Sequence, residues 1–374
     1  MIKAATVLIA VVAFASAACL AGEQADWPCF RGSTTMAGAA ADALPAKLEL
    51  LWTAEAGSAV ESTAAIVGDR VYVGTSAGKL LCLSLADGKP AWEFKASGAV
   101  TAAPCVSGGS VYVGDESGVF HALKASTGEP LWKFAAGSKV VSSAAVAGDA
   151  VLFGSYDNKL YCLETATGTT RWAFAADAQV HCSPCVAGGL AIIAGCDGKV
   201  RMIDVATGKE KAAAAVQSNF SVSPAWCEGH VYVGSLGGEY LAVRCDDGKV
   251  VWQVREEGDG GSCYAGAAVR GDAVIFASRS NRVFRLDRAT GERRWVFAAK
   301  GKVDSSPVIA GESVFFGSVD GTIYGLALKD GSVAWKFEAG SEVTASPAIA
   351  RGRMVIGTAD GAVYCFGGRQ GRSR

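Results

Sequence analysis

The sequence predicts an all-β protein, a single eight-bladed β-propeller built from four-stranded antiparallel blades. Three observations predict it. A unit of about forty residues recurs from Trp52 to Phe366, each unit contains short apolar runs separated by Gly, Asn or Asp, and most units end on a tryptophan. Four short strands at a forty-residue period are typical of propellers, in which a blade buries its faces only against its neighbours.

One complete copy of the unit runs from Ala145 to Trp172. Its apolar runs and turns alternate along the chain as 145–146, turn 148–149, 151–154, turn 157–158, 160–163, turn 167–168 and then Trp172. Gly, Asn and Asp tolerate the positive φ that tight hairpin turns require, so each run is expected to be a strand that pairs with the next.

The tryptophans mark the fourth strand of each blade. A large aromatic on this outermost strand can wedge against the neighbouring blade, so we expect blade-docking contacts at Trp52, Trp92, Trp132, Trp172, Trp252, Trp295 and Trp335. Ala212 occupies the missing position. Trp226 lies where other first strands carry Val or Ile, and it is expected either to fill the gap left by Ala212 or to face the channel as a ligand platform.

The two ends of the repeat predict how the ring closes. Trp52 lies on a fourth-strand segment that precedes the first blade, and the last unit stops after its third strand, so the N-terminal strand should complete the eighth blade. This closure covers edge strands that would otherwise be free to aggregate. The expected organisation is a signal peptide at 1–21, a lead-in segment at 22–49, the propeller at 50–366 and a disordered basic tail at 367–374.

The first residues have the layout of a secretory signal peptide. Lys3 precedes the apolar run Ala4 to Ala15, and small residues follow. Cleavage by ordinary signal peptidase after Ala17 and a lipoprotein-type cleavage that leaves a lipid anchor on Cys19 both stay open. The chain is therefore expected to be exported, periplasmic or associated with the outer membrane, and monomeric.

Composition argues against a nucleic-acid partner. The 374 residues carry a net charge near -1, whereas phosphate binding needs a basic surface. Among the twelve cysteines, Cys82, Cys162 and Cys365 share one position in different blades, so they cannot pair with one another and are expected to be small buried hydrophobic residues.

Two cysteine patterns remain. Cys182 and Cys185 are three residues apart on a first strand and point to opposite faces, which argues against a shared metal. A disulfide between Cys182 and Cys196, across the hairpin turn at 188–189, is the better hypothesis and depends on the register of that hairpin.

Candidate binding residues follow from aligning the blades just after each loop between blades, at the expected mouth of the central channel. The residues there able to do polar chemistry are Glu61, His181, Tyr264 and Asp304, and the simplest interpretation is a solvated rim. The three-residue insertion within 255–261 lies on the same face. Its carboxylates Glu256, Glu257 and Asp259 could bind Ca²⁺, but a solvated acidic loop is the favoured interpretation.

The third-strand-to-tryptophan segments 123–132 and 286–295 resemble the repeat of pyrroloquinoline-quinone-type propellers. The Ser-Pro first strands at 183–184, 223–224, 306–307 and 346–347 and the opening Asp26-Trp27-Pro28-Cys29-Phe30-Arg31-Gly32 share this resemblance. One branch of the family contains dehydrogenases with a quinone, a bound Ca²⁺ and an Asp base. The other resembles the propeller lipoprotein of the outer-membrane β-barrel assembly machinery, which uses no cofactor.

The second branch fits this chain better. The chain has no adjacent cysteine pair and no long insertions between blades to build a cofactor pocket. The expected function is a non-catalytic scaffold, without cofactor, that binds a protein partner in the cell envelope. The alternatives are a small oxidoreductase dependent on pyrroloquinoline quinone with calcium and a carbohydrate-binding propeller, for which Tyr264, Tyr156 and Trp226 are the candidate exposed aromatics.

Overall fold

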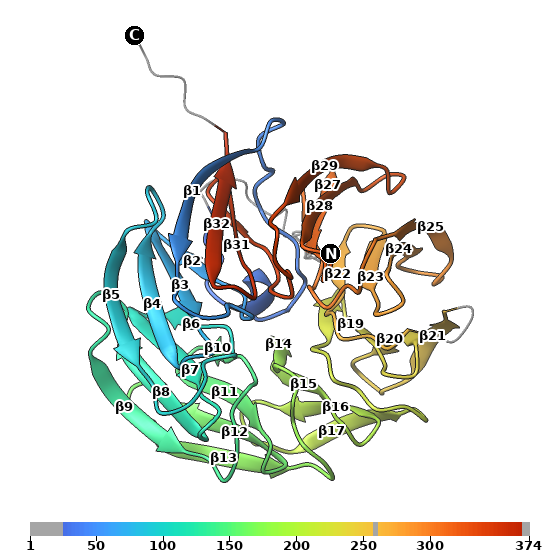
Figure 1. Ribbon diagram of the computed structural model, residues 1–374. Helices are drawn as coiled ribbons and strands as arrows, with labels where there is room; N and C mark the ends of the chain where they lie inside the picture. Colours follow the sequence, from blue (N-terminus) through green and yellow to red (C-terminus); the bar gives the residue numbers. More distant parts are fainter. Residues whose placement is uncertain (1–24, 257–260, 369–374) are drawn as a thin grey trace, which may run out of the picture.

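The computed structural model describes residues 25–256 and 261–368. These residues form eight four-stranded antiparallel sheets arranged as blades around a central axis (Figure 1), which confirms the predicted propeller. The signal segment with Cys19, the loop residues Glu257 and Asp259, and residues 369–374 of the predicted tail lie outside the described residues. The tail was predicted to begin at 367, which is wrong for Gly367, because this residue ends strand β32 (Ala362–Gly367). Within the described part, no helix has the length and apolar character to cross a membrane.

Each blade starts with a three-residue strand next to the axis. These innermost strands are β2 (Ala65–Val67), β6 (Cys105–Ser107), β10 (Ala145–Ala147), β14 (Cys185–Ala187), β18 (Ala225–Cys227), β22 (Ala268–Arg270), β26 (Val308–Ala310) and β30 (Ala348–Ala350). The second strands are β3 (Arg70–Gly74), β7 (Ser110–Gly114), β11 (Ala150–Ser155), β15 (Leu190–Ala194), β19 (His230–Gly234), β23 (Ala273–Ala277), β27 (Ser313–Gly317) and β31 (Arg353–Gly357).

The outer half of each blade is longer. The third strands are β4 (Lys79–Ser84), β8 (Val119–Lys124), β12 (Lys159–Glu164), β16 (Lys199–Asp204), β20 (Glu239–Arg244), β24 (Arg282–Asp287), β28 (Thr322–Ala327) and β32 (Ala362–Gly367). The outermost strands are β5 (Pro90–Lys95), β9 (Pro130–Ala135), β13 (Thr170–Ala175), β17 (Glu210–Ala215), β21 (Val250–Arg255), β25 (Arg293–Ala298), β29 (Val333–Glu338) and β1 (Glu49–Glu55).

Burial explains the sequence pattern of the strands. The four middle residues of β12 are buried on both faces because neighbouring blades cover them, and the strand is accordingly a continuous apolar run. The outermost strand β13 alternates between half-buried and exposed residues because only one of its faces is covered. The turn between β11 and β12 contains Asn158 at a φ of 68°, as the turn chemistry predicts.

The N-terminal strand closes the ring. β1 pairs antiparallel with β32, from Glu49 opposite Gly367 to Glu55 opposite Ala362. The eighth blade therefore joins both ends of the propeller (Figure 1), as predicted.

The lead-in segment forms a strap across the inside of the ring. A short 3₁₀ helix, η1 (Phe30–Gly32), interrupts it, and Trp27 exchanges two backbone hydrogen bonds with Ile66. Further carbonyls of the strap accept the amides of innermost-strand residues from other blades, namely Val106, Val186, Trp226, Val269 and Ile309. Residues 27–40 thus satisfy backbone donors that would otherwise face the central channel.

Candidate functional site

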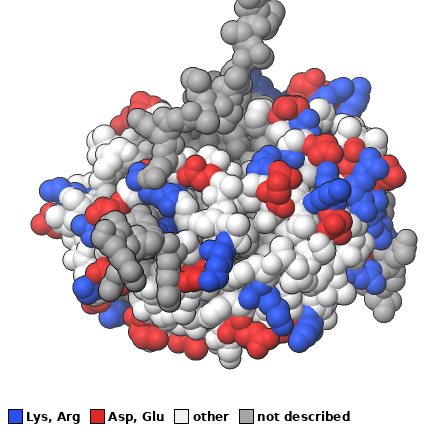
Figure 2. All heavy atoms as spheres, turned by 90° about the horizontal axis from the view of Figure 1, so that it is seen from above, with Lys and Arg blue, Asp and Glu red and all other residues white. Residues whose placement is uncertain are grey.

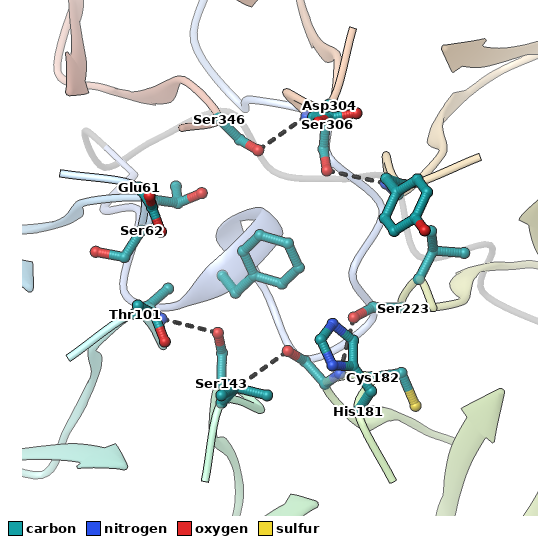
Figure 3. A pocket seen from close by; sticks show the side chains of 18 of the residues that line it. Glu61, Ser62, Thr101, Ser143, His181, Cys182, Ser223, Asp304, Ser306 and Ser346 are labelled. Carbon is teal, nitrogen blue, oxygen red and sulfur yellow. Dashed lines mark hydrogen bonds between the residues drawn. The ribbon is translucent and has the colours of Figure 1, made fainter. Parts of the chain in front are cut away.

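A cavity of about 180 Å³ opens at the mouth of the channel. One residue from each blade lines it at the level just after the loop between blades, and these residues are Glu61, Thr101, Val141, His181, Ser221, Tyr264, Asp304 and Thr344. Phe30 of the strap also lines the cavity. The cavity is therefore a funnel with the strap at its base, and Figure 3 shows the labelled side chains around it.

The structure brings the four candidate residues Glu61, His181, Tyr264 and Asp304 to this one opening but not into one cluster. Glu61 is exposed and comes from the first blade, whereas His181 comes from the fourth. Only Tyr264 and Asp304, from the sixth and seventh blades, are connected, and the connecting residue is Arg279.

Arg279 lies in the turn between β23 and β24. Its guanidinium stacks on the ring of Tyr264 at 3.6 Å from the centroid, and its Nε and Nη2 each donate to a carboxylate oxygen of Asp304 at 2.8 Å. The hydrogen bonds to Asp304 raise the pKa of Arg279, so the guanidinium stays charged. A flat aromatic, a cation and a carboxylate thus share one part of the rim, where Tyr264 is 37% exposed and Asp304 is half-buried.

His181 lies on the other side of the mouth. Its Nδ1 is 2.6 Å from the hydroxyl of Tyr156, and burial lowers the pKa of His181. The ring is therefore neutral at neutral pH. Tyr156, one of the aromatics that the sequence offered for carbohydrate binding, is occupied by this contact.

A second ring of polar groups lies one level below the rim. Seryl hydroxyls accept the backbone amide of the equivalent residue in the preceding blade at 2.8 to 2.9 Å, in the pairs Ala103 to Ser143, Ser143 to Ser183, Ser183 to Ser223, Gly266 to Ser306 and Ser306 to Ser346. Figure 3 shows these bonds linking one blade to the next. The repeated serine was visible in the sequence, but its role in the channel was not predicted.

The tryptophans dock as their spacing suggested. The indole Nε1 of six of them donates to a carbonyl of the next blade at 2.8 to 3.0 Å, in the pairs Trp52 to Leu85, Trp92 to Ala125, Trp132 to Thr165, Trp172 to Val205, Trp252 to Arg288 and Trp295 to Leu328. Trp335 packs edge-on against Phe366 of the eighth blade. The rings also lie on turn glycines such as Gly168, where an added Cβ would be 2.6 Å from Trp132.

Ala212 has no indole ring to lie on the turn glycine of the next blade, Gly248, and backbone atoms take the place of the ring. An added Cβ on Gly248 would be 2.7 Å from the carbonyl oxygen of Ala213, so the two blades approach more closely there. Trp226 is on the innermost strand β18, and its amide donates to Thr35 of the strap. It does not line the mouth cavity, so the structure does not support its use as a ligand platform there.

The predicted disulfide between Cys182 and Cys196 is absent, because both residues are free thiols. The sulfur of Cys182 instead accepts the amide of Ala194, and burial raises the pKa of its thiol to about 12. The eleven cysteines of the described residues are all free, and most are buried.

The prediction of a solvated acidic loop is wrong for Glu256. This residue is 3% exposed, and its carboxylate accepts hydrogen bonds from Tyr240, Ser278, Ser280 and Arg282. Glu256 follows β21 directly and turns inward, so its oxygens are already occupied by donors from two neighbouring blades.

The residues at the mouth do not match a quinone with its calcium. Calcium takes six to eight oxygen ligands, yet both oxygens of Asp304 accept Arg279, and Glu61 is in a different blade. Among the described residues, no group of three His, Cys, Asp or Glu side chains is placed to hold a metal ion. The cavity is also smaller than the 300 Å³ or more of ordinary cofactor pockets.

One family model matches most of the chain. Residues 43–155, 116–262 and 247–374 each match the family model described as outer membrane protein assembly factor BamB. No curated protein sequence matches the chain.

Several solved structures share the fold. BamB from Moraxella catarrhalis is 21% identical with a TM-score of 0.75, and the alignment covers 88% of this chain and 100% of that one. The quinohemoprotein alcohol dehydrogenase from Comamonas testosteroni is 14% identical with a TM-score of 0.78, covering 94% and 82%. A europium-containing methanol dehydrogenase is 13% identical with a TM-score of 0.80, covering 92% and 98%. At these identities the likeness concerns the fold alone.

Proposed function

The chain belongs to the family of the outer membrane protein assembly factor BamB, and from this premise we propose that it is a non-catalytic scaffold that binds a protein partner in the cell envelope. It acts without a cofactor, as an exported monomer on the periplasmic side or at the outer membrane. A lipid anchor on Cys19 would be its attachment to the membrane.

The observation that carries this proposal is the rim patch formed by Tyr264, Arg279 and Asp304. Tyr and Arg are enriched among the residues that dominate protein interfaces, because each combines a large flat surface with hydrogen-bonding groups. The pairing with Asp304 and the stacking on Tyr264 hold the arginine in place before a partner arrives, so little side-chain entropy is lost on binding.

The shape and charge of the protein also favour a macromolecular ligand. Phe30 lies at the base of the funnel and the hairpins around it are short, so a partner would contact the rim rather than enter the axis. On the face drawn in Figure 2, basic and acidic residues are interspersed rather than gathered into one basic patch. Such a surface suits a protein better than a nucleic acid.

Affinity capture from outer-membrane extracts tests the proposal. The wild-type protein is compared with Arg279→Ala and with the control Arg294→Ala, which also removes a surface arginine that pairs with an aspartate, Asp287, but lies on the outermost strand β25. We expect Arg279→Ala to lower the yield of a specific partner at least tenfold and Arg294→Ala to leave it unchanged. Equal yields from all three proteins would show that the rim patch does not bind the partner.

The enzymatic alternative is tested in parallel. Purified protein is mixed with pyrroloquinoline quinone and Ca²⁺, and the bound chromophore and dye reduction are measured. We expect no stoichiometric quinone complex. A one-to-one complex that reduces a dye in the presence of an alcohol would show that the protein is an oxidoreductase and not a non-catalytic scaffold.

A further inference from the structure

The ring of serine hydroxyls below the rim has no side-chain hydroxyl at Gly266, nor at Ala103 of the second blade. In the neighbouring blades this position is Ser223 and Ser306, and each serine accepts an amide from the preceding blade. Gly266 has no hydroxyl to accept the amide of Ser223. Its own amide still donates to Ser306 at 2.9 Å. The missing side chain therefore leaves a notch in the wall of the cavity, which Gly266 and Ser306 both line.

Arg31 of the strap fills the space behind this notch. The side chain is 2% exposed, and its Nη2 donates to the carbonyl of Ala267 at 2.6 Å. An added Cβ on Gly266 would be 3.5 Å from the Nε of Arg31 and equally far from the Oγ of Ser306. The guanidinium thus lies directly against the notch, where the sixth blade contributes no hydroxyl to the ring.

The charge of Arg31 is not balanced. Its Nε and Nη1 are buried without a hydrogen-bond partner among the described residues. Burial lowers the pKa of Arg31 to about 9, so at neutral pH the guanidinium is still a buried cation. An uncompensated buried charge is costly, and an anion next to it would remove much of that cost.

The backbone around Arg31 is shaped to keep it there. Arg31 itself has a φ of 62°, and Gly38, at a φ of 60°, faces the guanidinium so closely that an added Cβ would overlap Nη2. A substituted residue at 38 would have to displace the arginine. The strap is therefore folded around this side chain, although the side chain makes only one hydrogen bond with the residues that the structure describes.

We propose that the notch at Gly266 binds a small monovalent anion, such as a halide ion or a carboxylate the size of formate, between the guanidinium of Arg31, the hydroxyl of Ser306 and the amide of Ser223. The guanidinium and the amide are donors, and the hydroxyl of Ser306 can donate its own hydrogen while it accepts the amide of Gly266. The carbonyl oxygen of Ser223, 3.6 Å from an added Cβ on Gly266, also borders the notch, so the anion has to sit on the side of Arg31 and Ser306. The anion takes the place of the hydroxyl that is missing at Gly266 and neutralises the buried charge of Arg31. This inference concerns the base of the funnel and does not depend on the proposed scaffold function.

Bromide is the first probe, because its anomalous scattering identifies it in a crystal. Full-length protein is crystallised with sodium bromide, and its thermal midpoint is measured in increasing bromide against sodium gluconate at constant ionic strength. We expect an anomalous peak beside Arg31 and a midpoint that rises with bromide, because a ligand that binds only the folded state stabilises it. Formate, tested as a competitor, distinguishes a halide-selective notch from one that also takes carboxylates.

The matched variant is Gly266→Ser. Nothing lies closer than 3.5 Å to the added Cβ, and the φ of this glycine is not positive, so the substitution should fold and introduce the serine that five other blades carry here. We expect it to fill the notch and weaken bromide binding at least tenfold. Ala103→Ser is the control, since it adds a serine at the equivalent position of the second blade, away from Arg31, and should leave binding unchanged.

Two results would overturn the proposal. One is the absence of an anomalous peak at Arg31 together with no effect of formate. The other is an equal response to bromide in the wild type, Gly266→Ser and Ala103→Ser, which would show that the anion effect does not arise at the notch.

Discussion

Single side chains join the blades of this propeller. The indole of Trp132 lies on Gly168 and donates to the carbonyl of Thr165, so it contributes both apolar burial and a hydrogen bond across the interface between the second and third blades. Asp115 acts within one blade. It is fully buried and accepts hydrogen bonds from Ser117, the amide of Val119 and His121. We therefore expect Trp132 and Asp115 each to contribute to the free energy of unfolding, by different mechanisms.

Trp132→Ala removes the docking contact and leaves a cavity between two blades. We expect the free energy of unfolding to fall by about 3 kcal/mol, the lower end of the range for large aromatic residues, because Trp132 is only half-buried. Leu131→Ala is the control, since Leu131 is the adjacent residue and 53% exposed. Denaturant unfolding measures both, and an equal loss from the two variants would contradict the docking role.

Asp115 makes stability depend on pH. Burial by itself would raise its pKa, but the hydrogen bonds from His121, Ser117 and Val119 together hold the pKa below the ordinary value of 3.8. A carboxyl with a lowered pKa stabilises the fold above its unfolded-state pKa, and this contribution is lost as the pH falls through the folded-state value.

Asp115→Asn should therefore be less stable than the wild type by about 2 kcal/mol at pH 7, since it weakens several buried hydrogen bonds. The difference should shrink as the pH is lowered below 3.8. Urea unfolding at pH 7, 5 and 3 measures it. A difference that stays constant down to pH 3 would show that the charge of Asp115 is not the source.

At the scale of elements, two inner features connect blades that the sheets leave separate. The serine ring links successive blades through amide-to-hydroxyl bonds, and the strap links blades that are far apart in the sequence through its carbonyls. Both satisfy backbone groups at the axis, where the three-residue innermost strands make few bonds of their own.

Ser183→Ala breaks one link of the ring. The amide of Ser143 then loses its acceptor inside the protein, which should cost about 1 to 3 kcal/mol. Ser183→Thr keeps the hydroxyl and is expected to recover most of this loss. If alanine and threonine at this position gave the same unfolding free energy, the hydroxyl would have no role in linking the blades.

An alanine at Gly38 should disturb the strap, whereas an alanine at Gly68 should not. Gly38→Ala places a Cβ into the guanidinium of Arg31, whereas Gly68→Ala meets nothing within 4 Å, and both glycines have a φ near 60°. We expect Gly38→Ala alone to speed amide hydrogen exchange at Val269 and Ile309, whose amides donate to residues 37 and 38 of the strap. Equal exchange rates in the two variants would mean that the strap does not depend on Arg31.

Over the whole molecule, periodicity decides how much the sequence can predict. The strands, the closure by β1 and the positions of Glu61, His181, Tyr264 and Asp304 around one opening all follow from aligning eight copies of one unit. Features that do not repeat were missed. Phe30 and Arg31 belong to the non-repeating lead-in, so alignment of the blades gave them no position relative to the channel.

The contacts of two long side chains, Arg279 and Glu256, were not predicted for a different reason. Arg279 reaches from a turn of its own blade to the next, and Glu256 turns inward where a polar loop was expected. The direction of such a side chain depends on which donors and acceptors the neighbouring blade presents. That arrangement is a tertiary property, and residue type and spacing along the chain do not determine it.

A protein partner that binds the rim patch at the mouth of the funnel should be detectable in the cell envelope. The most direct test is photo-crosslinking in intact cell envelopes, with a photoreactive amino acid at position 264 and, as a control, at the exposed position 131 on the outermost strand of the second blade. We predict that position 264 gives a defined crosslinked protein and that position 131 does not give the same product. No crosslink at 264, or the same products at both positions, would contradict the account.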